Sequence, residues 1–151
     1  MGLYVHIPFC TNICTYCDFS KMYYKKEWVD RYLEALKKEI QQYAIDVPIT
    51  TVYIGGGTPS SLTTEQLQTL LQMLQVYTNN VLEYTIEVNP ESMSYEKLQL
   101  FKAYGINRLS IGVQTFNEKI LKKIGRQHCN QEVFRLIYQA QEIGINTISI
   151  D

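Results

Sequence analysis

The chain has 151 residues, of which 46% are hydrophobic, 12% aromatic and 19% charged, and its formal net charge at pH 7 is −1. This length allows one domain with a buried core, and the near-neutral charge argues against a nucleic-acid partner, which needs clustered Lys and Arg. The sequence offers neither the roughly 20 consecutive apolar residues of a membrane span nor the basic and apolar start of a signal peptide. A cytoplasmic location is therefore expected.

Strands and helices are predicted to alternate along the chain. In order, apolar periodicity and turn residues predict a strand at 3–7, a helix at 28–44, a strand at 51–54, a helix opened by a Thr63–Gln66 capping box, a strand at 84–88, a helix at 94–103, a strand at 108–111, helices at 117–125 and 130–144, and a strand at 147–150. Alternation of this kind predicts an α/β fold with a parallel sheet and crossover helices.

An internal repeat supports that fold class. Residues 105–112 (GINRLSIG) are similar to residues 144–151 (GINTISID), and each segment reads as a helix stop, a tight turn and a strand. The repeat therefore favours a series of β/α units, with about five parallel strands and outer helices. Because the last strand would end the sheet with unpaired backbone groups, we expect residues 1–151 to be one domain that is incomplete at its C-terminal side.

Three of the four cysteines are crowded into the pattern C-x3-C-x2-C, at Cys10, Cys14 and Cys17, directly after the first predicted strand. Thiolates select zinc or iron–sulfur clusters. A structural zinc site normally has four protein ligands, whereas a [4Fe–4S] cube held by three cysteines leaves one iron open to a small molecule. The spacing thus favours a ligand-binding cluster. A zinc site completed by His6, His128 or Cys129 stays open as an alternative, although His128 is expected at the surface and Cys129 as a plain thiol.

Polar or glycine-rich segments follow each of the other predicted strands. They are Gly55–Pro59, Glu87–Pro90, Gly112–Phe116 and Asp151. Since the carboxyl ends of parallel strands meet at one edge of the sheet, all of them are expected to converge there with the cysteines. Glycines allow a ligand close to the backbone, Glu87 can accept hydrogen bonds from an amino group, and Gln114 can donate and accept.

The cysteine motif, with the aromatic Tyr16 before its last cysteine, resembles that of the radical S-adenosylmethionine (SAM) superfamily. The preceding run from Tyr4 to Cys10 (YVHIPFC) is similar to the oxygen-independent coproporphyrinogen III oxidase family, which includes the heme chaperones called HemW, and the resemblance extends over essentially the whole chain. It implies a partial (β/α) barrel of the radical SAM type, a [4Fe–4S] cluster on the three cysteines and a reductive cleavage of SAM. It also implies a set of SAM contacts, namely Tyr4, Gly56, Gly57, Thr58, Glu87, Gln114, Arg126 and Asp151.

Two departures favour the chaperone branch over the oxidases. The oxidases carry a further cysteine two positions after the third cluster cysteine, where this chain has Phe19, and they have a longer segment before the Tyr-x-His motif, which here starts at Tyr4. The resemblance then implies heme or porphyrin as a further ligand, a heme-acceptor protein, including one at the membrane periphery, and an electron donor. No heme ligand can be assigned from the sequence, and His6 belongs to a strand motif that both branches share.

Overall fold

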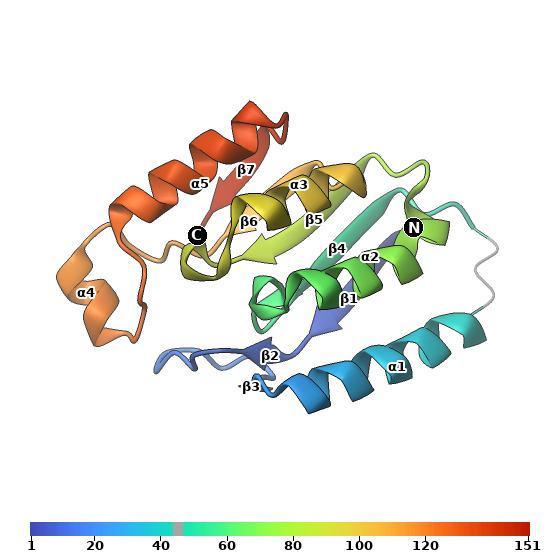
Figure 1. The fold of residues 1–151 in the computed structure, drawn as a ribbon, viewed down its shortest axis with the longest axis horizontal. Helices are drawn as coiled ribbons and strands as arrows, with labels where there is room; N and C mark the ends of the chain where they lie inside the picture. The colour runs from blue at the N-terminus through green and yellow to red at the C-terminus, as the bar shows by residue number, and fades with distance from the viewer. Residues whose placement is uncertain (44–46) are drawn as a thin grey trace.

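The computed structural model describes residues 1–43 and 47–151. Five parallel strands form the main sheet in the order β1 (Gly2–Ile7), β4 (Thr51–Gly56), β5 (Glu83–Val88), β6 (Arg108–Ile111) and β7 (Thr147–Ile150). Each strand is paired in parallel with the next one in this order. The predicted parallel sheet of five strands is therefore confirmed (Figure 1).

The longer helices form a layer over one face of the sheet (Figure 1). They are α1 (Lys26–Gln42), α2 (Thr64–Thr78), α3 (Tyr95–Ala103) and α5 (Asn130–Glu142), with 3-10 turns η1 (Pro59–Ser61) and η2 (Pro90–Ser92) after β4 and β5. The short α4 (Glu118–Lys123) lies beyond the carboxyl ends of the strands. Helices on one face only, over a parallel sheet, are the arrangement of a partial (β/α) barrel, as expected. Within the described residues, no helix combines the length and the apolar character needed to cross a bilayer.

The core lies between the sheet and this helical layer. Alternate residues of the strands, such as Val52 and Ile54 of β4, are fully buried and pack with Leu67, Leu70 and Leu74 of α2. Successive side chains of a strand point to opposite faces, so the residues between them face away from the helices. That second face is polar and carries Tyr4, Tyr53, Glu87 and Ser110 in neighbouring strands.

Local signals in the sequence locate most element ends. Thr63 caps α2, since its side chain accepts from the Gln66 N–H at 3.2 Å while Gln66 accepts from the Thr63 N–H at 3.1 Å. Gly105 and Gly144 end α3 and α5 with φ of 84° and 83°, the left-handed conformation that glycine adopts at helix ends. The two repeat segments are thus the same structural unit, a glycine stop followed by a strand.

Most boundaries lie within one or two residues of the predictions, and α1 and β4 illustrate the differences. Helix α1 begins at Lys26, two residues before the predicted start, and Ala44 at its predicted end lies outside the described residues. Strand β4 continues through Gly55 and Gly56 because β1 supplies backbone partners for both of them. Tertiary pairing here overrides the low strand propensity of glycine.

A two-stranded parallel pair was not predicted. Its strands are β2 (Phe9–Cys10) and β3 (Met22–Tyr23). The Met22 N–H donates to the Pro8 carbonyl at 2.7 Å and the Tyr24 N–H to the Cys10 carbonyl at 2.8 Å. This pair joins the two ends of the cysteine loop, residues 10–21, and so fixes where the loop leaves the sheet.

Candidate functional site

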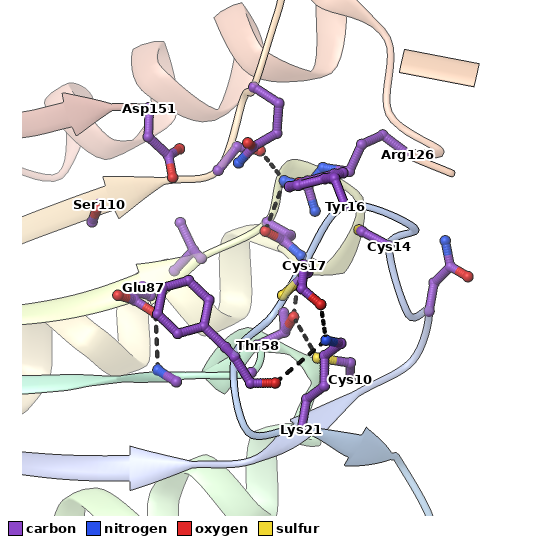
Figure 2. A pocket seen from close by; sticks show the side chains of 18 of the residues that line it. Cys10, Cys14, Tyr16, Cys17, Lys21, Thr58, Glu87, Ser110, Arg126 and Asp151 are labelled. Atoms are coloured by element: carbon purple, nitrogen blue, oxygen red, sulfur yellow. Dashed lines mark hydrogen bonds between the residues drawn. The ribbon is translucent and has the colours of Figure 1, made fainter. Parts of the chain in front are cut away.

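The carboxyl ends of the main strands and the cysteine loop enclose a cavity of about 260 Å³. Figure 2 shows side chains from both sides pointing into it. The lining includes all three motif cysteines and every predicted SAM contact except Tyr4. The residues that line the cavity are Cys10, Asn12, Cys14, Tyr16, Cys17, Phe19, Lys21, Tyr53, Gly56, Gly57, Thr58, Glu87, Val88, Asn89, Ser110, Gly112, Gln114, Arg126 and Asp151. The predicted convergence at this edge of the sheet is confirmed.

The cysteine loop forms one wall of the cavity. Cys10 is buried, Cys14 and Cys17 are half-buried, and none of them is in a disulfide. The Lys21 ammonium donates to the Cys17 carbonyl and, at 3.3 Å, to that of Phe19, and the Asn12 amide donates to the Gly125 carbonyl. These side-chain contacts to backbone carbonyls hold the loop in place. The three sulfur atoms have no covalent partner.

Burial raises the pKa of the Cys10 thiol, and the neighbouring Cys17 and Cys14 add to the rise, while a hydrogen bond from Thr58 opposes it. The Thr58 Oγ1 lies 3.4 Å from the Cys10 Sγ. Gly57 allows this approach, because a Cβ there would lie 2.8 Å from the Pro8 carbonyl carbon and 3.0 Å from the Cys10 Sγ. Metal ligands must be deprotonated, so bound iron would replace the proton of this buried thiol and stabilise its thiolate.

The donor set fits a cubane cluster better than a single ion. Among residues 1–43 and 47–151, no three His, Cys, Asp or Glu side chains are gathered as they would be around one metal ion. A [4Fe–4S] cluster binds each thiolate through a different iron, so its three sulfur ligands do not have to converge on one point. Cys129 does not line the cavity. Nothing in this geometry supports the zinc alternative.

The opposite wall begins with Glu87, whose carboxylate is fixed at the end of β5. Its Oε1 accepts from the Tyr53 hydroxyl at 2.7 Å and its Oε2 from the Gly56 N–H at 3.0 Å. Burial, together with the hydrogen bond to Glu87, raises the pKa of Tyr53 to about 12, so this phenol stays protonated and donating. The predicted glycine segment and the predicted acid thus form one unit.

Gln114 has a φ of 67°, which is unusual for a residue other than glycine. Such backbone conformations persist where the surrounding structure enforces them, often at binding sites. Here the Gln114 N–H donates to the Asp151 carbonyl at 2.6 Å. The loop after β6 and the end of β7 are therefore tied together where both reach the cavity.

Arg126, one of the predicted SAM contacts, is buried where it lines the cavity. Its residue exposure is 6%, and its Nη2 donates to the Asn89 Oδ1 at 3.0 Å and to the Gly112 carbonyl. Its Nη1 lies 3.5 Å from a Glu91 carboxylate oxygen. The Nε of Arg126 is buried without a partner among the described residues, and a buried donor of this kind calls for an acceptor.

His128 is buried, with an exposure of 4%. The prediction that it lies at the surface is therefore wrong. Its Nδ1 lies 3.1 Å from the second carboxylate oxygen of Glu91. The sequence pattern could not reveal this burial. It depends on η2, the turn after β5, which packs against α5 and carries Glu91.

Tyr4 is not brought to this cavity. Its side chain is 56% exposed, stacks on Tyr53 with ring centroids 6.1 Å apart, and lies 2.9 Å from the His6 Nδ1. The His6 Nε2 lies 3.1 Å from the Ser20 carbonyl oxygen, so both ring nitrogens of His6 have hydrogen-bond partners. His6 acts here as a tie between β1 and the cysteine loop, and nothing in its geometry marks it as a heme ligand. The role of Tyr4 toward SAM stays a prediction.

Several lining residues were missed from the sequence. Tyr53 and Ser110 could have been found, because strand alternation places them on the same sheet face as Glu87. Asn89 was predicted only as part of the segment Glu87–Pro90, with no contact of its own, yet it joins Thr58 to Arg126. Lys21 and Asn12 carry no signal in the sequence, since their contacts depend on how the loop closes.

Comparisons with known proteins agree with this arrangement. The heme chaperone HemW of Bacillus subtilis (strain 168) is 44% identical over 154 residues, which cover 98% of this chain and 41% of that protein. The oxygen-independent coproporphyrinogen III oxidase of Salmonella typhimurium is 35% identical over 157 residues, which cover 100% of this chain and 34% of that protein. The chain therefore spans about two fifths of the length of the first relative and a third of the second.

The solved structure of coproporphyrinogen III oxidase (HemN) from Escherichia coli superimposes with a TM-score of 0.90 and 34% identity, over 99% of this chain and 36% of that one. A family profile described as the radical SAM superfamily matches residues 4–151. Members of this superfamily bind a [4Fe–4S] cluster and SAM. From its cysteine motif, its partial barrel and this match, the chain belongs to the radical SAM superfamily.

Proposed function

We propose that residues 1–151 are part of the radical SAM core domain of a HemW-like heme chaperone, in which Cys10, Cys14 and Cys17 hold the [4Fe–4S] cluster. One observation supports this most strongly. A single cavity has three free cysteines on one wall and the polar strand ends on the other. The cluster would sit against the first wall, with its open iron toward the second.

SAM has an amino group, a carboxylate, a sulfonium and a nucleoside, and the strand ends offer partners for each kind of polar group. Glu87 and Asp151 supply carboxylates and Gln114 an amide. Arg126 is a buried cation whose Nε–H has no partner among the residues that the structure describes. Gly56, Gly57 and Thr58 form the floor next to Cys10. We therefore assign these seven residues to SAM binding. When bound, the cluster supplies the electron that cleaves SAM reductively.

The chaperone is favoured over the oxidase by the residue that follows the cysteine motif. Phe19 lines the cavity at the position where the oxidases carry a further cysteine, and its side chain is 70% exposed. Two HemW relatives, from Bacillus subtilis and Lactococcus lactis, are 44% and 42% identical to this chain, against 35% for the Salmonella oxidase. On this proposal the protein binds heme or a porphyrin and passes it to an acceptor protein, which can lie at the membrane surface. An electron donor reduces the cluster.

Oxygen-independent coproporphyrinogen III oxidation is the second candidate. The close superposition on the Escherichia coli oxidase favours it. Both candidates use the same cluster and the same SAM site, so only the reaction itself separates them.

The test uses full-length protein purified and reconstituted without oxygen. We expect about four iron and four sulfide per chain, binding of added heme, and transfer of that heme to an apo-acceptor. With SAM, a reductant and coproporphyrinogen III, we expect no protoporphyrinogen. Formation of protoporphyrinogen would overturn the chaperone in favour of the oxidase, and tetrahedral zinc in place of iron would overturn both.

A further inference from the structure

Two ionisable residues form a buried pair directly behind the cavity without lining it. Glu91 belongs to η2 after β5, and His128 follows Arg126 by two positions. The His128 side chain is 0% exposed and that of Glu91 18%. Burying ionisable groups is costly unless they are paired. We therefore ask what this pair does next to Arg126.

Glu91 uses a different oxygen for each neighbour. Its Oε2 lies 3.1 Å from the His128 Nδ1, and its Oε1 lies 3.5 Å from the Arg126 Nη1. An arginine and a carboxylate that are left alone tend to pair through two parallel hydrogen bonds. His128 occupies the oxygen that such a pairing would need, so Glu91 holds Arg126 by one oxygen only.

The remaining contacts of Arg126 fix its direction. The Asn89 Oδ1 and the Gly112 carbonyl accept from Nη2. A Cβ at Gly112 would lie 2.6 Å from the Arg126 Nη2 and 2.7 Å from the Asn89 Oδ1, so only glycine leaves room for this contact. The guanidinium is thereby anchored through Nη2, while its buried Nε–H stays without a partner in the described part of the chain.

The same network reaches the cysteine wall. The Asn89 Nδ2 donates to the Thr58 Oγ1 at 3.2 Å, and Thr58 donates to the Cys10 Sγ at 3.4 Å. A chain of side-chain contacts thus runs from His128 through Glu91, Arg126 and Asn89 to the cluster cysteine. Any rotation of Arg126 would disturb both ends of the cavity.

We propose that His128, acting through Glu91, is a positioning residue that keeps Arg126 available for the carboxylate of SAM. The inference rests on the proposed SAM site and adds two residues that the cavity lining does not include. Without His128, Glu91 is free to turn both oxygens toward Arg126 and to compete with the ligand carboxylate for its donors. Loss of His128 therefore weakens the binding of ligands that carry this carboxylate, and spares those that lack it.

The experiment measures ligand dissociation constants on anaerobically reconstituted full-length protein. SAM binding is followed by the change it causes in the electron paramagnetic resonance spectrum of the reduced cluster. We expect His128→Leu to raise the dissociation constant of SAM about tenfold, the effect of losing a hydrogen bond to a charged group. His128→Asn, whose side-chain amide can donate in place of Nδ1–H, is expected to restore the affinity to within about twofold.

A second ligand separates positioning from general damage. Binding of 5′-methylthioadenosine, which keeps the nucleoside and lacks the amino acid, is measured by equilibrium dialysis and should be equal in the unsubstituted protein and in His128→Leu. Equal weakening of both ligands, or an unchanged affinity for SAM, overturns the inference. Cys129→Ala, the neighbouring substitution that touches neither Glu91 nor Arg126, is the control, and an equal loss there also overturns it.

If His128→Leu fails to take up the cluster, His128→Phe gives the test in its place. The phenyl ring keeps a planar group in the same buried position but cannot bond to Glu91, and the same loss confined to SAM is expected. Failure of the proposed function has a different signature, since the unsubstituted protein would then show no spectral change with SAM. That outcome overturns the SAM site and this inference together.

Discussion

The two walls of the cavity differ in how far the polypeptide alone fixes them. The wall of strand ends is buried and internally bonded, as Thr58 and Arg126 show with an exposure of 6% each. On the cysteine wall Cys14 and Cys17 are half-buried, while Tyr16 and Phe19 are 46% and 70% exposed. Folding alone therefore prepares the wall of strand ends, where we propose that SAM binds, whereas side-chain contacts to backbone carbonyls hold the cysteine loop. Metal binding would add a direct link between its sulfur atoms.

The largest effect is expected on the cysteine wall. Cys14→Ala removes one of three thiolates in a site with no fourth cysteine in the cavity, so we expect the iron and sulfide content and the broad visible absorbance of the reconstituted protein to fall to background. Cys129→Ala is the matched control and should keep all of them. Loss of the cluster in the control would mean that Cys129 is a ligand.

A smaller effect is expected where the two walls touch. In Gly57→Ala the new Cβ would lie 2.8 Å from the Pro8 carbonyl carbon and 3.0 Å from the Phe9 nitrogen. Since these are backbone atoms that cannot turn aside, we expect a loss of about 3 kcal/mol in the free energy of unfolding, measured by urea denaturation. Gly2→Ala is the control, because its nearest neighbour at 2.9 Å is the Thr51 side chain. Equal stability of the two variants would contradict the close packing of the walls.

The smallest effect concerns the pH dependence of stability at Glu91, which supports the wall of strand ends through its contact with Arg126. Burial raises the pKa of Glu91, but the hydrogen bond to His128 and the charge of Arg126 outweigh it and hold this pKa below its ordinary value of 4.5. A lowered pKa in the folded state means stability that is present above pH 4.5 and is lost as the pH falls through the folded pKa. We expect Glu91→Gln to remove this loss and to cost on the order of 1 kcal/mol at pH 7, as measured by thermal unfolding between pH 3 and pH 7. An unchanged acid dependence in the variant would show that Glu91 does not carry it.

The sequence by itself determined the architecture and most of the site. Alternating periodicity located the five strands, glycine stops marked the ends of α3 and α5, and the thiol spacing together with the strand-end polar residues placed Cys10, Glu87, Gln114 and Asp151 at one edge. These features are local in the chain or follow from the rule that parallel strands end on the same side.

Only the tertiary structure decided which of these side chains touch one another. The burial of Arg126 and His128, the link through Asn89 and the placement of Tyr4 outside the cavity depend on contacts between segments far apart in the chain. No local pattern encodes such contacts, because a histidine or arginine near a helix end has the same propensity whether solvent or a neighbouring strand end faces it. In this chain the packing of η2 against α5 places a neighbouring strand end, rather than solvent, next to His128.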